Sequence, residues 1–304
     1  MGHQEAIIIS QSGRDITHSE IETIQETAKT FWQLSRKEFV ETVCEHLGWH
    51  TASGGNKSEA CLKLLERLEG EGKLSLPKKQ PQNPRRLLRK VIKQPARTEP
   101  GADIACSLKE LGPVELKVVG QGAELDLLKE YIQRYHYLGY KKPFGYNVQY
   151  FISCEQGLLG GFVFSGAARA IQVRDQWLGW SKKRRLENLA WVVNNARFLI
   201  FPWVQVHNLA SHVLGQVAGR IARDWQDRWG YRPLLMETFV DGQRYRGTCY
   251  EAAGWRKLGL TSGRGLVRKG KSYTTSQKIV FAKPLAPDFQ EQLCAGPLLG
   301  RVEL

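Results

Sequence analysis

A proline-broken basic run divides this chain into two parts that must fold around separate cores. Between Pro77 and Asp103 the sequence PKKQPQNPRRLLRKVIKQPARTEPGAD holds five prolines and eight lysines or arginines. Proline fixes φ and removes a backbone donor, and closely spaced like charges repel one another, so such a run builds no core. We therefore expect a linker, with a smaller folded unit before it and a larger one after it.

The predicted organisation has four parts. A helical, winged-helix DNA-binding domain is expected over residues 1–77 and a basic, proline-rich linker over 78–112. A larger α/β domain is expected over 113–286, followed by a C-terminal tail over 287–304. With 304 residues, of which 42% are apolar, the chain is long and apolar enough to bury a sizeable core.

The charge balance indicates a polyanionic partner. Lysine and arginine number 44 against 30 aspartates and glutamates, a formal net charge of +14. Nucleic acid is the first partner to expect and an anionic membrane surface the second. The sequence contains neither an apolar run of membrane-spanning length nor a signal pattern, which favours a soluble cytoplasmic protein without membrane insertion. The six cysteines form no C-x-x-C pair, so free thiols are expected and no metal site is predicted.

The N-terminal segment reads as a winged helix-turn-helix. Ser19 with Glu22, and Ser35 with Glu38, have the three-residue spacing of a capping box and predict two helix starts. After a glycine-rich turn a third helix is expected over 57–69, and KLSLP, ending at Pro77, alternates as a short strand does.

Two interpretations of the third helix stay open. In the first it enters a major groove and presents Lys57, Lys63 and Arg67 to DNA. In the second it belongs to a packing or dimerisation module with a solvated charged face, because glutamates interrupt the basic residues. The linker has the same two interpretations, as a phosphate-contacting segment or as a merely solvated one. Its expected phosphate contacts are Lys78, Lys79, Arg85, Arg86, Arg89 and Lys90.

From Val114 strand and helix patterns alternate, which predicts an α/β domain with a long helix following a central strand. Strands are expected over 114–119, 147–154, 158–171, 196–203, 233–240 and 265–270, and helices over 123–139, 182–193, 208–229 and 247–259.

Polar residues gather where the 233–240 strand ends. Glu237 and Asp241 lie at its C-terminal side, where open α/β sheets bind ligands. A buried carboxylate needs a partner, and Arg197 on the neighbouring strand is the expected one. A structural ion pair and a catalytic role are therefore equally consistent with Glu237.

The start of the 208–229 helix is a second candidate position. Asn208 is placed to cap the helix with its side chain, and Ser211 lies in the first turn. Backbone donors at a helix N-terminus favour an anion or a developing oxyanion, His207 or His212 is expected to converge on the ligand there, and His207 is a candidate base. The alternative for each of these residues is an ordinary hydrogen-bonding role.

Aromatic and basic residues are interleaved in QRYHYLGYKKPFGY, residues 133–146. Tyr137, Lys141 and Lys142 in this stretch are candidates for base stacking and phosphate contact, against the alternative of a loop that covers the core. Tyr245, Arg246 and Arg264, on loops later in the chain, are candidate phosphate clamps.

The element order, together with CYEAAGWRKLG, is similar to the GCN5-related N-acetyltransferase (GNAT) fold. Tyr250, followed by Gly254 and Trp255, matches the spacing of a late helix in that fold, and the resemblance implies Tyr250 as a general acid. GNAT proteins cradle acetyl-CoA pyrophosphate on a glycine-rich turn. Here WVQVHNLASH has no glycine before Gly215, so the cofactor stays unassigned.

The combination of NLASHVLG, ETFVDGQRYRGTCYEAAGW and LGLTSGRG resembles the DruA-type domain of Druantia anti-phage systems, which also occurs beside transposases. LSRKEFVETVCEHLGW in the N-terminal part carries the same likeness, and the C-terminal pieces more distantly resemble the Mom DNA-modifying proteins of phages. The implied fold is α/β, an N-terminal winged helix-turn-helix joined by a basic linker to a divergent GNAT-like mixed-sheet domain.

The resemblance implies a DNA-binding protein that modifies or recognises bases in anti-phage defence. The alternative is a non-catalytic module that recognises DNA ends or single strands for a transposase, helicase or nuclease partner. Enzyme activity is left open, with acyl or other group transfer to DNA as the reaction considered. In that case the catalytic candidates are Tyr250, Asp241, Glu237, Ser211 and Asn208.

Overall fold

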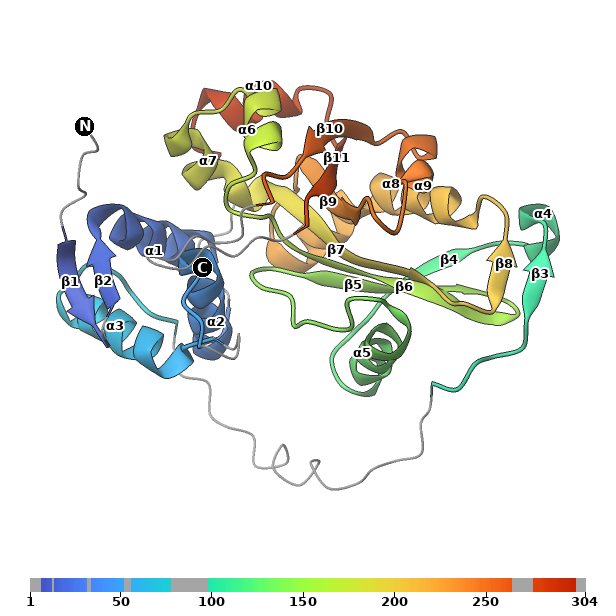
Figure 1. The fold of residues 1–304 in the computed structure, drawn as a ribbon, viewed down its shortest axis with the longest axis horizontal. Coiled ribbons are helices and arrows are strands. Elements are labelled where there is room, and N and C mark those ends of the chain that lie inside the picture. The colour runs from blue at the N-terminus through green and yellow to red at the C-terminus, as the bar shows by residue number, and fades with distance from the viewer. Residues whose placement is uncertain are drawn as a thin grey trace.

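The computed structural model of the chain describes residues 7–12, 14–31, 34–51, 56–77, 98–263 and 276–298 (Figure 1). The N-terminal unit is an antiparallel hairpin followed by three helices. Its elements are β1 (Ile7–Gln11), β2 (Arg14–Thr17), α1 (His18–Thr30), α2 (Arg36–Leu47) and α3 (Ser58–Gly70). Apolar side chains from all three helices, among them Ile24, Phe39 and Leu64, are completely buried between them.

Capping boxes start the first two helices, one of them where the sequence predicted it. Ser35 caps α2 with Glu38, as expected, and Gly48 ends it in a left-handed conformation. The predicted start at Ser19 is wrong, because Thr17 caps α1 and exchanges hydrogen bonds with Glu20.

The predicted strand KLSLP is wrong, and a winged helix-turn-helix is not confirmed. The segment after α3 is irregular, since Leu76 N donates to Glu69 Oε1 at 2.7 Å and the Pro77 carbonyl accepts from Arg36 Nε at 3.0 Å. These contacts hold the segment against α2 and α3 and take up groups that a strand partner would need. The hairpin of this unit precedes the helices instead.

The larger unit is built on a seven-stranded mixed sheet in the order β10-β11-β9-β7-β6-β5-β4 (Figure 1). Its strands are β4 (Glu115–Val118), β5 (Val148–Cys154), β6 (Gly157–Gly166), β7 (Val192–Ile200), β9 (Leu235–Asp241), β10 (Arg256–Leu260) and β11 (Lys278–Pro284). Five of the six neighbouring pairs in this order are antiparallel, and β7 with β9 forms the parallel pair.

Helices cover both faces of this sheet. They are α5 (Ala123–Tyr135), α6 (Gln172–Leu178), α7 (Lys182–Asn188), α8 (Leu209–Trp229), α9 (Thr248–Ala252) and α10 (Phe289–Ala295). Leu128 of α5 lies against Gly161 of β6, whereas Asp224 of α8 accepts a hydrogen bond from Tyr150 of β5. Gly161 pairs with Phe151, and side chains of successive strand residues point to opposite faces, so Tyr150 points to the face away from α5. Helices α5 and α8 therefore lie on opposite faces of the sheet.

Most of the elements predicted for this unit are present, and the structure contains several others that were not predicted. The long helix expected over 208–229 is α8, while β10, β11, α6 and α10 were not predicted. The strand predicted over 265–270 lies outside the described residues. Residues 98–112, assigned to the linker, contain β3 (Ile104–Cys106) and α4 (Leu108–Leu111). Strand β3 pairs in parallel with β8 (Val204–Val206), just before α8.

Strands β7 and β9 diverge towards their carboxyl ends. Their parallel register covers only Val192–Asn194 against Leu235–Glu237, after which β7 follows β6 and β9 follows β11. A register shift in the β6–β7 pairing lies just beyond this point, and such a bulge bends the strand that carries it. We call the region beyond Asn194 and Glu237 the splay.

Candidate functional site

Tyr250 is the central side chain of the splay. It lies on α9, which begins after Gly247, a glycine with φ +79° whose added Cβ would lie 2.6 Å from the Phe281 ring. That close approach seats the Tyr250 ring on Phe281 at 5.6 Å, with Trp255 edge-on at 5.2 Å. The ring is therefore held in one position by aromatic packing.

The Tyr250 hydroxyl lies among polar groups of the two diverging strands. Asn195 Nδ2 of β7 donates to it at 3.3 Å, and Thr238 Oγ1 of β9 donates to the Asn195 carbonyl at 3.0 Å. Burial raises the pKa of Tyr250 above its ordinary value, so the phenol stays protonated at physiological pH. The group can donate a hydrogen bond or a proton, but it is not a base.

Two buried polar atoms beside Tyr250 have no hydrogen-bond partner within the described part of the chain. They are Asn195 Oδ1, an acceptor, and Trp255 Nε1, a donor. Buried polar atoms are normally paired, and those that are not call for an explanation such as a water or a ligand. Both atoms belong to residues that contact Tyr250, Asn195 through its amide and Trp255 through its ring.

Aromatic and cationic side chains lie together at the carboxyl end of β9. Arg244, from the loop after β9, places its guanidinium 5.3 Å from the Tyr137 ring, and Tyr245 lies 5.5 Å from the same ring. His136 stacks on Tyr137 at 4.9 Å, and burial with nearby Arg197 lowers the pKa of His136 to about 4. The imidazole is therefore neutral at physiological pH. We call Tyr137, Arg244 and Tyr245 the rim.

Asp241 fixes the loop that carries two of the rim residues. Its carboxylate accepts from Lys278 Nζ at 2.7 Å and from Gln243 N at 3.2 Å, while its carbonyl accepts from Tyr245 N. The hydrogen bond from Lys278 lowers the pKa of Asp241. The carboxylate is thus ionised at neutral pH and orients the loop.

Glu237 makes a buried ion pair, but not with the predicted residue. Its Oε2 lies 2.7 Å from Arg174 NH1 with both side chains completely buried, and its Oε1 accepts from Ala168 N at 2.8 Å. The predicted pairing with Arg197 is wrong, because Glu237 is in register with Asn194 and the strands diverge before Arg197. Arg197 donates to the carbonyl of Gly139 instead, at 2.8 Å.

The start of α8 does not have the predicted cap. Asn208 adopts a left-handed backbone, φ 64°, and its side chain makes no capping hydrogen bond. Asparagine tolerates this conformation better than most residues, which accounts for it at this position. Ser211 Oγ donates to the Asn208 carbonyl at 3.0 Å, and His207 and His212 are exposed.

The predicted nucleic-acid contacts fall into three groups. Lys63 is exposed on α3 and Lys57 is exposed directly before it, and Arg67 of α3 pairs with Glu71 at 3.0 Å. Tyr137 belongs to the rim, and Arg246, the residue after Tyr245 of the rim, is exposed. Lys141 and Lys142 pair with carboxylates of α2. The remaining predicted contacts lie outside the described residues: Lys78, Lys79, Arg85, Arg86, Arg89, Lys90 and Arg264.

Sequence reasoning missed Asn195, Arg244 and Lys278. A signal for Asn195 was present, since two adjacent asparagines interrupt an otherwise apolar buried strand in VVNNARFLI. Arg244 and Lys278 carried no comparable signal, because loop and strand-edge cations are common on any basic protein.

The structure thus defines a class of protein, a mixed α/β domain with a splayed parallel strand pair, joined to a small helical unit. The family described as Druantia protein DruA matches residues 68–292, and the chain belongs to it. A comparison with curated proteins gave no match. No described helix is both long and apolar enough to cross a bilayer.

Solved structures similar to this chain are acetyltransferases. A Bacillus subtilis acetyltransferase in complex with CoA is 9% identical with a TM-score of 0.34, the match covering 57% of this chain and 100% of the other. An aminoglycoside acetyltransferase in complex with coenzyme A and kanamycin is 12% identical, with a TM-score of 0.36 and coverage of 59% and 98%. The ribosomal-protein-S18-alanine N-acetyltransferase from Escherichia coli is 9% identical, with a TM-score of 0.35 and coverage of 62% and 99%. Likeness at this level does not bear on the activity or ligands of this chain.

Proposed function

We propose that this protein binds DNA in anti-phage defence and recognises, at the splay, a base that is not held in a duplex stack. The observation that carries the proposal is the rim of Tyr137, Arg244 and Tyr245 next to the buried centre of Tyr250 and Asn195. Aromatic faces and a guanidinium provide the stacking and phosphate contacts that unpaired nucleotides use. The acceptor and donor left unpaired at Asn195 and Trp255 complement the polar edge of a base.

Recognition is favoured over chemistry by the protonation states at the splay. A general base works best with a pKa near the operating pH. Tyr250 stays protonated, Asp241 ionised, and His136, with a pKa of about 4, is a weak base. A step that cuts or unwinds DNA is then the task of a helicase, nuclease or transposase partner.

The second candidate function is modification of the recognised base. The protonated state of Tyr250 favours it, because a phenol held beside the Asn195 amide has a proton to give to a leaving group. Nucleosides from plasmid and phage DNA made with and without the protein are compared by mass spectrometry. A new base that disappears with Tyr250→Phe establishes modification, and unmodified DNA leaves recognition.

Duplex DNA is assigned to α3 and to the basic run over 78–97. Lys63 is exposed on α3 and Lys57 directly before it, and the run contains eight lysines or arginines. Replacing Lys78, Lys79, Arg85, Arg86, Arg89 and Lys90 by glutamine is expected to weaken binding and flatten its salt dependence. Each lost phosphate contact lowers the slope of log K against log salt by about 0.9 on a duplex. An unchanged slope contradicts the assignment.

Fluorescence anisotropy with labelled single-stranded and duplex oligonucleotides tests recognition at the splay. Stacking of one base on an aromatic residue is worth about 1–3 kcal/mol, so Tyr137→Ala should weaken single-strand binding roughly 5- to 150-fold. Arg244→Ala should also weaken it, whereas Arg232→Ala, an exposed arginine before the start of β9, should not. Wild-type affinity in both rim variants refutes the proposal.

A further inference from the structure

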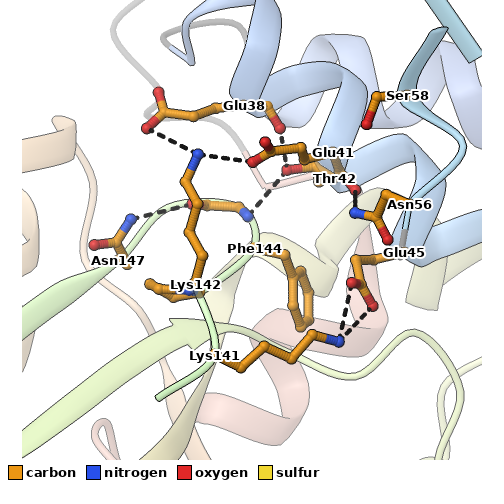
Figure 2. A pocket seen from close by; sticks show the side chains of 12 residues that line it. Glu38, Glu41, Thr42, Glu45, Asn56, Ser58, Lys141, Lys142, Phe144 and Asn147 are labelled. Carbon is orange, nitrogen blue, oxygen red and sulfur yellow. Dashed lines mark hydrogen bonds and ion pairs between the residues drawn. The ribbon is translucent and has the colours of Figure 1, made fainter. Parts of the chain in front are cut away.

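A pocket of about 350 Å³ lies between the N-terminal unit and the sheet domain, with opposite charges facing each other across it (Figure 2). Three carboxylates from one side of α2, Glu38, Glu41 and Glu45, line it together with Lys141 and Lys142. In a chain with net charge +14 this is a locally acidic surface, with one more carboxylate than lysine. We call Glu38, Glu41 and Glu45 the acidic row.

Each of the two lysines is paired with the acidic row. Lys142 Nζ lies 2.7 Å from Glu41 Oε2 and 3.9 Å from Glu38 Oε1, and Lys141 Nζ lies 3.0 Å from Glu45 Oε1. The lysine side chains are 49% and 67% exposed. Ion pairs this exposed contribute little stability, so a competing anion can replace them.

The contact has a buried centre behind its ionic edge. Gly145 N donates to Thr42 Oγ1 at 3.1 Å, and the Phe144 ring lies edge-on to His46 at 5.8 Å. Gly145 has φ +65°, and an added Cβ would lie 2.9 Å from the Phe31 ring. The N-terminal unit is therefore docked by close packing, while the acidic row adds only its exposed ion pairs.

The same short segment reaches the splay. Tyr137 belongs to the rim, and the carbonyl of Gly139 accepts from Arg197 Nε at 2.8 Å, two residues before Lys141. A nucleic acid seated on the rim therefore has Lys141 and Lys142 as the next cations along this segment. While the N-terminal unit is docked, these two lysines are paired with the acidic row, and the strand would meet its carboxylates.

We propose that the acidic row masks Lys141 and Lys142 from phosphate, so that docking of the N-terminal unit limits the affinity of the splay for nucleic acid. The inference rests on the proposed function and adds its regulation. The carboxylates occupy the positions of phosphates on the two lysines, and a bound strand displaces them. Removing the carboxylate charge frees both lysines while leaving the rim intact.

The test compares four full-length proteins by anisotropy titration of a labelled single strand over a range of salt concentrations. They are the wild type, Glu41→Gln/Glu45→Gln, a control Glu115→Gln/Glu155→Gln with the same charge change on other exposed positions, and Glu41→Gln/Glu45→Gln/Lys141→Gln/Lys142→Gln. Freeing two exposed pairs should tighten binding about 2- to 30-fold in the first variant. Two added phosphate contacts on a single strand steepen the slope of log K against log salt by about 1.4.

Masking predicts that the quadruple variant loses both the gain in affinity and the steeper slope, and that the control acquires neither beyond its general charge effect. Hydrogen exchange over 141–147 should become faster when a strand binds the wild type. Wild-type binding with an unchanged slope in Glu41→Gln/Glu45→Gln overturns the masking and leaves the proposed function standing. If none of the four proteins binds nucleic acid, both are overturned.

Discussion

The buried ion pair between Arg174 and Glu237 provides the sharpest prediction about how the splay is supported. Burial opposes the charge on Arg174, but the carboxylates of Glu237 and Asp175 outweigh it and raise the pKa of the guanidinium. Arg174 NH1 also donates to the Ala168 carbonyl at 2.7 Å. Glu237→Gln keeps the shape of the side chain and removes its charge, so Arg174 keeps Asp175 as its remaining partner.

The expected loss is large because neither side chain has any exposed surface. Breaking a buried pair by removing one member costs about 3–5 kcal/mol. Because Arg174 keeps its ion pair with Asp175 in Glu237→Gln, we expect a loss near the lower end of this range. For a chain of this size, about 3 kcal/mol corresponds to a melting temperature lower by roughly 6–12 °C. The control is Asp126→Asn, which breaks an exposed pair with Lys129 and should cost about 0.5 kcal/mol or less.

Urea unfolding of a double-mutant cycle measures the coupling. Arg174→Met and Glu237→Leu should each be at least as destabilising as Glu237→Gln, while Arg174→Met/Glu237→Leu, which closes the cycle with these two, should recover much of the loss because it buries no charge. If Glu237→Gln is no less stable than Asp126→Asn, or if the single losses simply add, the pair does not support the splay. Loss of DNA binding in Glu237→Gln at full stability would restore a direct role for this carboxylate.

Three further predictions concern the interior. Burial and nearby Arg169 lower the pKa of His46 to about 3 from 6.5, so the unfolded chain binds the proton first and stability falls as pH drops from 6.5 towards 3. Between pH 7 and 5 this costs about 2 kcal/mol, so in urea unfolding the stability of His46→Leu should depend on pH by that much less than the stability of the wild type. Tyr250→Phe keeps the ring packing and loses one hydrogen bond, so it should cost about 1 kcal/mol in urea unfolding and weaken single-strand binding; unchanged binding excludes the hydroxyl from the site. Gly145→Ala adds a clash with Phe31 to the strain of φ +65°, so its melting temperature should fall further than that of Gly179→Ala, which has φ +76° and open space; equal losses would mean that Phe31 yields.

Sequence patterning predicted elements whose signals are local. The periodicity of 208–229 predicted α8 almost to the residue, and Ser35 with Glu38 predicted the start of α2. The apolar run of β9 was equally clear. In each case the residues that define the element also satisfy its backbone, so the interpretation needs no distant partner.

The splay and its partners could not be predicted in this way. Whether β7 and β9 stay paired depends on a register shift between β7 and β6, which no local pattern encodes. The partner of Glu237 changed from Arg197 to Arg174 because the strands separate before Arg197 reaches it. Ile279–Ala282, bounded by Pro284, was by contrast a strand signal that sequence reasoning passed over.

The stretch from Gln133 to Tyr146 shows why composition alone could not assign a role to its residues. Aromatic and basic residues there predicted one stacking surface, but the fold gives its two halves different tasks. Tyr137 is part of the rim, whereas Lys141 and Lys142 pair with the acidic row. The halves are separable by experiment: Tyr137→Ala should change affinity at every salt concentration, and Lys141→Gln/Lys142→Gln should matter only after the acidic row is neutralised. If the lysine pair weakens wild-type binding as much as Tyr137→Ala does, the lysines are already in contact with the strand and the division between the two halves is wrong.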